Sequence, residues 1–223
     1  MKKLVIVGIG ETAKLAYEYF SYDSDYNVVA FAADTAYIEN GMKLSDLPVV
    51  DVNCLEGLYS PDEYSVFVAI SGSHLNRNRT SVYKRIKDKG YKMASYISSR
   101  AFVWRNVEIG DNCFILENNT LQPFTKIGNN VTLWSGNFIA HSSTVEDNCF
   151  ITSHVAVSGF CKIGTNTFIG VNSSIVDEAI VSEDNFIIMG SVITKNTEPD
   201  RVYRGNPAVE QKVTAKRYCK VEE

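Results

Sequence analysis

Every sixth residue from position 103 to position 193 is Val, Leu or Ile, and this repeat limits the chain to very few folds. A period of six fits neither an α-helix, with a period near 3.6, nor a strand, with a period of 2. It is the repeat of a parallel β-helix, in which each hexapeptide forms one side of a triangular coil and points its aliphatic residue inward. Three hexapeptides make one coil, so residues 18 apart stack. The sixteen aliphatic residues are Val103, Ile109, Ile115, Leu121, Ile127, Leu133, Ile139, Val145, Ile151, Val157, Ile163, Ile169, Ile175, Val181, Ile187 and Ile193.

One hexapeptide is irregular. Its middle, Asp177-Glu178-Ala179-Ile180, lacks the small residue and the glycine found elsewhere in the repeat. We expect a small local distortion there without a change of register, because Val181 restores the period.

The first hundred residues have a different pattern, in which apolar runs alternate with helical segments. We predict strands over 4–7, 28–32, 66–70 and 93–97, and helices over 11–20 and 76–89. Alternating strands and helices with continuous apolar strands indicate a small parallel α/β domain of Rossmann type. The predicted organisation is therefore α/β followed by all-β: a Rossmann-like domain over 1–99, a parallel β-helix over 100–197, and a segment over 198–223 that caps the open end of the solenoid.

Bulk composition narrows the class of protein. A net charge of −4 and a pI near 5.5 argue against a nucleic-acid partner. The N-terminus has no secretory signal and no segment has the length of a membrane span, which favours a reducing cytoplasm. Three cysteines, Cys113, Cys149 and Cys161, each stand two residues before an inward aliphatic residue. We interpret them as core thiols rather than as zinc ligands or disulfide partners.

A candidate anion site lies near the N-terminus. The sequence GIGETA (8–13) follows a predicted strand and precedes a predicted helix, and bare backbone amides at a helix N-terminus attract phosphate. Asp34 ends the second strand, where an acidic residue often binds a ribose or base. Ser71-Gly72, after the next strand, is a further candidate edge of this pocket. Because the second domain does not resemble that of a dehydrogenase, a nucleotide that is substrate rather than redox cofactor fits better.

Histidine is the side chain whose ordinary pKa suits general base chemistry near neutrality. His141 occupies a turn of the repeat and stacks on Pro123 and Gly159, which leave its ring accessible. The pattern alone is equally compatible with a surface histidine that caps a turn. His154 lies on another side of the coil, where a packing role is the simpler interpretation.

Two further features have alternative interpretations. With His74 in the other domain and no clustered carboxylates, the three histidines do not favour a zinc site like that of β-helical carbonic anhydrases. Lys195, Arg201 and Arg204 gather where the solenoid ends, and they could face the phosphates of coenzyme A or simply solvate the cap.

The chain resembles the sugar acyltransferases of the sialic-acid O-acetyltransferase and bacillosamine N-acetyltransferase type. The resemblance covers almost the whole chain. The segments that carry it are VIVGIGETAK (5–14), FAADT (31–35), ILENNTLQPFTKIGNNVTLWSGNFIAHSS (115–143), FITSHVAVSGFCKIGTNTFIGVNSSI (150–175) and YRGNPA (203–208). It implies a left-handed β-helix, a homotrimer, and acyl transfer from acetyl-CoA to a sugar.

The resemblance assigns a general base to the position of His141. Relatives often follow this histidine with Asp or Glu, whereas Ser142 stands here. Either Ser142 fixes the ring by hydrogen bonding, or a carboxylate comes from elsewhere, with Glu117 and Glu146 as candidates.

The resemblance also implies two sets of binding residues. Coenzyme A would lie in a groove between adjacent β-helices, and the nucleotide of the sugar on the N-terminal domain. From the resemblance, the first set is Gly159, Gly170, Val171, Met189 and Gly190, with the amide of Gly159 facing the oxyanion, and the second is Gly8, Gly10, Glu11, Thr12 and Asp34. The charged cluster at the end of the solenoid adds Lys195 and Arg204 to the first set, and the edge after the third strand adds Ser71 and Gly72 to the second.

The leading hypothesis is an acetyl-CoA-dependent N-acetyltransferase of a nucleotide-linked amino sugar in surface-glycan biosynthesis, without a bound metal and with direct transfer in a ternary complex. One alternative keeps the chemistry and transfers the acetyl group to a sugar hydroxyl. Another is a non-catalytic trimeric protein that binds a nucleotide sugar.

Overall fold

The structure is a computed structural model and describes residues 1–221. Contacts divide the chain into two compact units. One contains Met1–Ser71 and Arg79–Tyr96, and the other contains Gly72–Asn78 and the chain from Ile97 onward. The predicted division at 99/100 lies close to this boundary, but no sequence pattern indicated that residues 72–78 pack with the solenoid.

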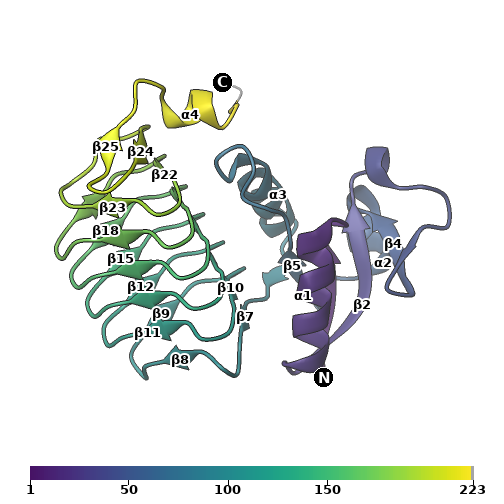
Figure 1. Ribbon diagram of the computed structural model, residues 1–223. Coiled ribbons are helices and arrows are strands. Elements are labelled where there is room, and N and C mark those ends of the chain that lie inside the picture. The colour runs from purple at the N-terminus through teal and green to yellow at the C-terminus, as the bar shows by residue number, and fades with distance from the viewer. Residues whose placement is uncertain (222–223) are drawn as a thin grey trace. The chain divides into compact units, whose positions relative to one another are not determined.

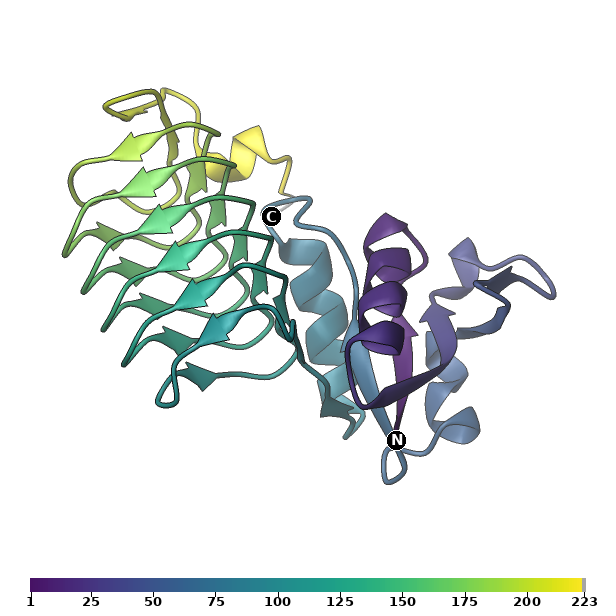
Figure 2. The same ribbon diagram turned by 60° about the horizontal axis from the view of Figure 1, so that its bottom comes forward.

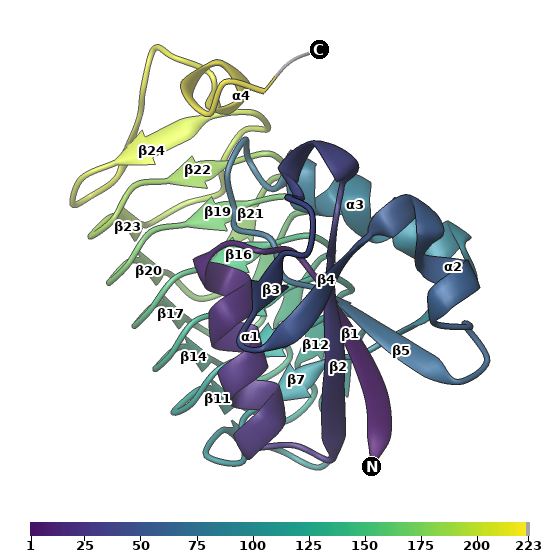
Figure 3. The same cartoon turned by 90° about the vertical axis from the view of Figure 1, so that its right-hand side faces the viewer.

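The first unit is built on a six-stranded sheet with the order β3-β4-β2-β1-β5-β6. Figure 3 shows β1 lying between β2 and β5. All neighbours are parallel except β3 and β4. The strands are β1 (Lys2–Val7), β2 (Tyr26–Ala33), β3 (Lys43–Leu44), β4 (Leu47–Asp51), β5 (Tyr64–Val68) and β6 (Lys92–Met93).

The connections of this unit are helical, as the parallel sheet requires. They are α1 (Glu11–Tyr22), α2 (Leu55–Leu58) and α3 (Arg77–Asp88), with 3-10 turns η1 (Thr35–Tyr37) and η2 (Val52–Cys54). The prediction of one strand over 93–97 was wrong. Lys92–Met93 pairs with β5, whereas β7 (Tyr96–Ile97) joins a sheet of the solenoid, because the chain passes from one unit to the other at this point.

The second unit is a parallel β-helix whose coils stack regularly (Figures 1 and 2). Strands 18 residues apart pair in register, as in Phe114↔Thr132 and Ile115↔Leu133. Three sheets form the sides, in the orders β25-β24-β22-β19-β16-β13-β10-β7, β23-β20-β17-β14-β11-β8 and β21-β18-β15-β12-β9.

The solenoid strands are two residues long until the last coil. They are β8 (Phe102–Val103), β9 (Glu108–Ile109), β10 (Phe114–Ile115), β11 (Thr120–Leu121), β12 (Lys126–Ile127), β13 (Thr132–Leu133), β14 (Phe138–Ile139), β15 (Thr144–Val145), β16 (Phe150–Ile151), β17 (Ala156–Val157), β18 (Lys162–Ile163), β19 (Phe168–Ile169), β20 (Ser174–Ile175), β21 (Ile180–Val181), β22 (Phe186–Ile187), β23 (Val192–Ile193), β24 (Val202–Arg204) and β25 (Val209–Glu210).

The aliphatic repeat forms the core of the solenoid. Every repeat residue from Ile115 to Ile193 is buried, and Val103 and Ile109 of the first coil pack against the same cluster half-buried. The three predicted core thiols are buried as well, and Cys161 donates to the carbonyl of Val176 at 3.1 Å. Burial raises the pKa of the Cys161 thiol, so the neutral form is favoured in the core.

Left-handed backbone at the corners lets each coil turn, and asparagine tolerates this conformation. Asn112, Asn130 and Asn148 have φ of 51°, 55° and 63°. They also form a ladder, with side-chain amide bonds of 2.8 and 2.9 Å between successive coils. In the irregular coil, Glu178 takes the left-handed position (φ 62°).

The expected distortion of that coil is not seen, and its register is kept. Ala179 is itself the small inward residue, in the place that Cys161 fills one coil earlier, and Lys162 pairs with Ile180 as the period requires.

The ends of the second unit are tied to the coils. Strand β24 pairs in parallel with β22, so the predicted cap begins as a further strand of the solenoid, and α4 (Ala215–Tyr218) follows. In the segment 72–78, Leu75 packs in a cluster with Val202 and Ala215. Arg77 adds an ion pair to Asp184 at 2.6 Å.

None of the helices within residues 1–221 has the length and apolar character needed to cross a membrane.

The inward-pointing aliphatic residues of the repeat should contribute most of the stability of the solenoid. Ile163→Ala should lower the stability by about 2–5 kcal/mol, because the fully buried side chain leaves a cavity. Ile180→Ala is the matched control, since Ile180 stands beside Lys162 on the paired strand with 46% of its surface exposed. Thermal unfolding followed by circular dichroism measures both. Equal losses for the two variants would contradict the inward assignment.

Candidate functional site

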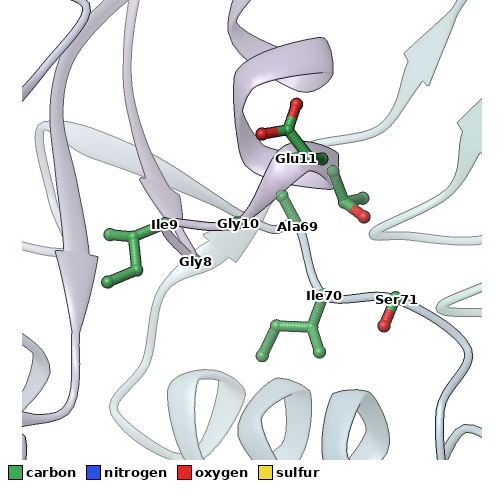
Figure 4. Close-up of a pocket in the computed structure, with 8 residues that line it drawn as sticks. Gly8, Ile9, Gly10, Glu11, Ala69, Ile70 and Ser71 are labelled. Carbon is green, nitrogen blue, oxygen red and sulfur yellow. The ribbon is translucent and has the colours of Figure 1, made fainter. Parts of the chain in front are cut away.

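The first unit contains a pocket of about 350 Å³ at the carboxyl ends of β1 and β5. Figure 4 shows the two chain segments that line it meeting at the start of α1. The lining residues are Gly8, Ile9, Gly10, Glu11, Thr12, Ala69, Ile70 and Ser71. Five of the seven predicted nucleotide-binding residues, Gly8, Gly10, Glu11, Thr12 and Ser71, thus lie together.

The glycines shape this pocket in different ways. Gly8 has φ +133°, and a Cβ there would stand 2.5 Å from the carbonyl oxygen of Ala69, so no side chain fits where the two segments cross. Gly10 is the N-cap of α1 and has open space around its Cα. No side chain caps the helix, so its first turn is left accessible.

The amides of this first turn are available to a ligand. Within residues 1–221, the N–H groups of Glu11 and Thr12 have no protein acceptor, as is normal for the first turn of a helix. The helix dipole adds partial positive charge there. The carboxylate of Glu11 is held by Lys14 at 2.6 Å, which offsets its repulsion toward an anion. The pocket can therefore bind a phosphate or diphosphate.

Two predicted members of this set lie outside the pocket lining. The Asp34 carboxylate forms an ion pair with Arg85 at 2.8 Å, a partner 51 positions away that the strand pattern did not indicate. Gly72 belongs to the other unit, where a Cβ would stand 2.8 Å from the ring of Phe150. Its small size serves close packing on the solenoid.

His141 lies at a corner of the β-helix with its side chain exposed. The side chain of Gln122 accepts its backbone N–H at 3.0 Å, and the ring of Phe160 packs edge-on at 4.9 Å between centroids. Neither ring nitrogen is engaged by any residue from 1 to 221. The backbone and ring of His141 are thus held in place, while its ring nitrogens remain free to accept a proton from a ligand, as a general base requires.

Gly159 stacks on His141 as predicted. A Cβ on Gly159 would stand 2.9 Å from Cε1 and 3.1 Å from Nε2 of His141, so the imidazole fills space that only a glycine leaves. In the described part of the chain the N–H of Gly159 donates to no acceptor. An open amide beside an open imidazole nitrogen is the donor-and-base pair used in acyl transfer.

The two carboxylates predicted as partners of His141 are engaged elsewhere, whereas the third candidate, Ser142, is not. Glu117 accepts a bond from Ser135 at 2.6 Å, and Glu146 is paired with Lys162 at 2.8 Å. The Ser142 hydroxyl makes no hydrogen bond to any described residue, and Ser142 takes the left-handed corner position with φ 58°. Asp177 was not predicted as a site residue, yet a Cβ added to Gly159 would stand 2.9 Å from its Oδ1. The 18-residue period could have found it, since Asp177 is two coils beyond His141.

The predicted coenzyme residues divide between two corners of the coil. Gly159 and Lys195 share the column of His141 by the 18-residue period. A second corner, that of His154, carries the others. There Gly190 donates to the carbonyl of Val171 at 2.8 Å, and a Cβ on Gly170 would stand 2.4 Å from the Met189 nitrogen, which makes Gly170 a packing residue. We call Gly170, Val171, Met189, Gly190 and Arg204 the corner set. Arg204 belongs to it because β24 pairs with β22, which places Arg204 next to Ile188, the residue 18 positions after Gly170.

The other two histidines, His154 and His74, make contacts within the protein. His154 packs over Gly136, where a Cβ would stand 2.8 Å from its ring, and Nδ1 of His74 is bonded to the Asn78 amide at 3.2 Å. Among residues 1–221, no three side chains of His, Cys, Asp or Glu are grouped to hold a metal ion.

Known proteins match this chain in fold and in the repeat. Residues 106–141 match the family described as bacterial transferase hexapeptide (six repeats). No curated protein matches this chain by sequence. The acetyltransferase domain of PglB from Neisseria gonorrhoeae superposes with a TM-score of 0.84 at 20% identity, over 95% of this chain and 100% of that domain. That domain has also been solved with acetyl coenzyme A.

Two structures of one enzyme are similarly close. PerB from Caulobacter crescentus, in complex with CoA and GDP-perosamine, gives a TM-score of 0.84 at 22% identity, over 95% of this chain and 98% of PerB. A variant of that perosamine N-acetyltransferase with one histidine changed to asparagine, with the same ligands, gives 0.82 at 20% identity, over 95% and 97% of the two chains. These matches confirm the predicted fold, a small α/β domain followed by a left-handed β-helix.

The pocket geometry makes a prediction about its two glycines. Gly8→Ala should destabilise the first unit by about 1–3 kcal/mol, because it combines a left-handed φ with a clash against the Ala69 carbonyl. Gly10→Ala should leave stability nearly unchanged, since its φ is −83° and its surroundings are open. Thermal unfolding of both variants is the measurement. A Gly8→Ala protein as stable as the parent would contradict the close crossing.

Proposed function

We propose that this chain is an acetyltransferase that uses acetyl-CoA to acetylate the amine of a nucleotide-linked amino sugar in surface-glycan biosynthesis. The observation that carries the proposal is the corner where the open imidazole of His141 lies beside the bare, unpaired amide of Gly159. The fold agrees with it, because relatives of the same architecture bind acetyl-CoA, or CoA together with GDP-perosamine.

The reaction follows from these two groups. Nε2 of a neutral His141 takes a proton from the acceptor amine as the nitrogen attacks the thioester carbonyl. The new N–C bond places negative charge on the carbonyl oxygen, which the N–H of Gly159 faces as a donor. The C–S bond then breaks, and the proton held by His141 passes to the sulfur of coenzyme A.

No nucleophilic side chain takes part. The three core thiols are buried, and burial disfavours the thiolate of Cys161. Ser142 has no base bonded to its hydroxyl among residues 1–221. Direct transfer in a ternary complex therefore fits better than an acyl-enzyme intermediate.

The pocket of the first unit would hold the diphosphate of the nucleotide sugar. Its volume of about 350 Å³ lies at the small end of ligand pockets, which suits part of the substrate rather than the whole. The amides of Glu11 and Thr12 would face the phosphate oxygens.

A homotrimer would bring the two coenzyme corners together. Exposed aromatic side chains occur along the solenoid from two coils before His141 to one coil after it, and a patch of this kind marks a surface that another protein covers. They are Phe102, Trp104, Phe124, Phe138 and Phe160. If a second copy covers this corner, Gly159 and Lys195 of one chain can face the other corner set, Val171, Met189, Gly190 and Arg204, of the next chain across one groove.

The first experiment measures thiol release from acetyl-CoA against UDP-, dTDP- and GDP-linked 3-amino and 4-amino sugars, with mass spectrometry of the products. We expect turnover with one amino sugar and the mass gain of one acetyl group. Turnover only with hydroxyl acceptors would replace N-transfer by O-transfer. Absence of both turnover and coenzyme A binding would end the acyltransferase proposal.

His141→Asn should reduce kcat by about 10²–10⁴-fold, because it removes the base and keeps a side chain of similar polarity. Coenzyme A affinity and thermal stability should stay close to those of the parent. His74→Asn is the control, since it removes a histidine from a left-handed position that asparagine tolerates, away from the corner. Retention of full activity in His141→Asn would show that another group is the base.

A further inference from the structure

Asp177 is a carboxylate at the candidate active site to which the proposed mechanism gives no role. It belongs to the corner column Pro123, His141, Gly159, Asp177 and Lys195, in which each residue stacks on the one 18 positions earlier. Because Gly159 has no side chain, the residues on either side of it both reach over its Cα.

The two side chains face the same small space. The position of a Cβ on Gly159 is 2.9 Å from Oδ1 of Asp177 and 3.1 Å from Nε2 of His141, so these atoms are at most 6.0 Å apart. They form no ion pair with each other. One nitrogen atom outside Gly159 can therefore hydrogen-bond to both, since each such bond spans about 2.7–3.2 Å.

The carboxylate is available for a ligand. Asp177 is exposed, and within residues 1–221 its side chain accepts no hydrogen bond and forms no ion pair. Lys195, the next residue of the column, is not paired with it. Glu178, beside it in the chain, adds negative charge to the same turn. An unneutralised carboxylate beside an imidazole favours a cationic group over a neutral one.

We propose that Asp177 binds the protonated amine of the acceptor sugar, together with His141, and that it makes the site select an amine over a hydroxyl. This assignment rests on the proposed function. An ammonium group has three donors, so it can bond to the Asp177 carboxylate and to Nε2 of His141 at the same time. Before the attack, its extra proton passes to Nε2 and from there to solvent, which leaves a neutral amine beside a neutral His141. The attack described above then follows. A neutral hydroxyl in the same place has one donor and no charge. Asp177 thus determines which acceptor binds, whereas His141 is the general base.

Equilibrium binding tests this without requiring turnover. The probes are matched pairs of nucleotide sugars linked to GDP, UDP or dTDP, each pair differing only in an amine or a hydroxyl at the sugar carbon, such as GDP-perosamine and its 4-hydroxyl counterpart. Each is titrated by calorimetry at pH 7 into the full-length protein saturated with coenzyme A. The parent protein should bind the amino sugar about 10- to 100-fold more tightly than its hydroxyl partner, as expected for a charge-assisted hydrogen bond.

Asp177→Asn should abolish that preference, raise KM for the amino sugar by a similar factor, and leave the affinity for coenzyme A alone unchanged. Glu178→Gln is the matched control, because it removes one charge from the same turn and keeps the backbone bond from Glu178 N–H to the Gly159 carbonyl, while the Glu178 side chain is not among the atoms nearest a Cβ on Gly159. It should keep the preference. Thermal unfolding of both variants confirms that they fold.

Three results would overturn the assignment. An unchanged amine preference in Asp177→Asn would show that the carboxylate does not bind the acceptor. An equal loss in Glu178→Gln would attribute the preference to the general charge of the turn. Failure of every probe to bind, in a protein that also shows no turnover, would remove the proposed function and this assignment with it. The first two results leave the proposed function standing.

Discussion

The stacking of coils at intervals of 18 residues is the constraint on which the second unit depends. Aliphatic side chains fill the axis, and parallel backbone bonds join each coil to the next, as in Ile139↔Val157. Because the core fixes the register, side chains at the corners are fixed in columns as well. The candidate active site is one such column, and its residues meet because they share a phase of the repeat, although they are far apart in the chain.

Both candidate binding regions depend on a glycine, whose lack of a side chain lets neighbouring groups come close. At Gly8, the absence of a Cβ lets the turn after β1 pass the end of β5 and opens the N-terminus of α1. At Gly159, it lets His141 and Asp177 approach a common space, next to a backbone N–H that donates to no acceptor among the described residues. Gly170 and Gly72 were also predicted to bind ligands, but backbone and ring atoms fill the space beside them. A glycine in a sequence therefore indicates close approach without telling whether a ligand or the protein itself comes near.

The division of the predicted coenzyme residues between two corners has a consequence for assembly. Two corners of one triangular coil point in different directions, so Gly159 and Met189 do not line a single groove on one chain. The exposed aromatic residues around His141, such as Phe124 and Phe138, supply the kind of surface that a neighbouring chain would cover. Under the proposed function, an incomplete site on one chain and an uncovered apolar surface beside it have a common explanation.

The sequence by itself determined the solenoid, its register, its buried thiols and the position of His141 over Gly159, because all of these follow from one period. It also placed the GIGETA turn at the start of a helix, since that motif is local. Only the tertiary structure decided which polar groups remain open. Asp34 is held by Arg85, Glu146 by Lys162, and Gly72 lies against Phe150, whereas Asp177 stays unpaired among the described residues. Pairing of this kind joins residues from different elements, and its distances are set by how those elements pack, which no local pattern records.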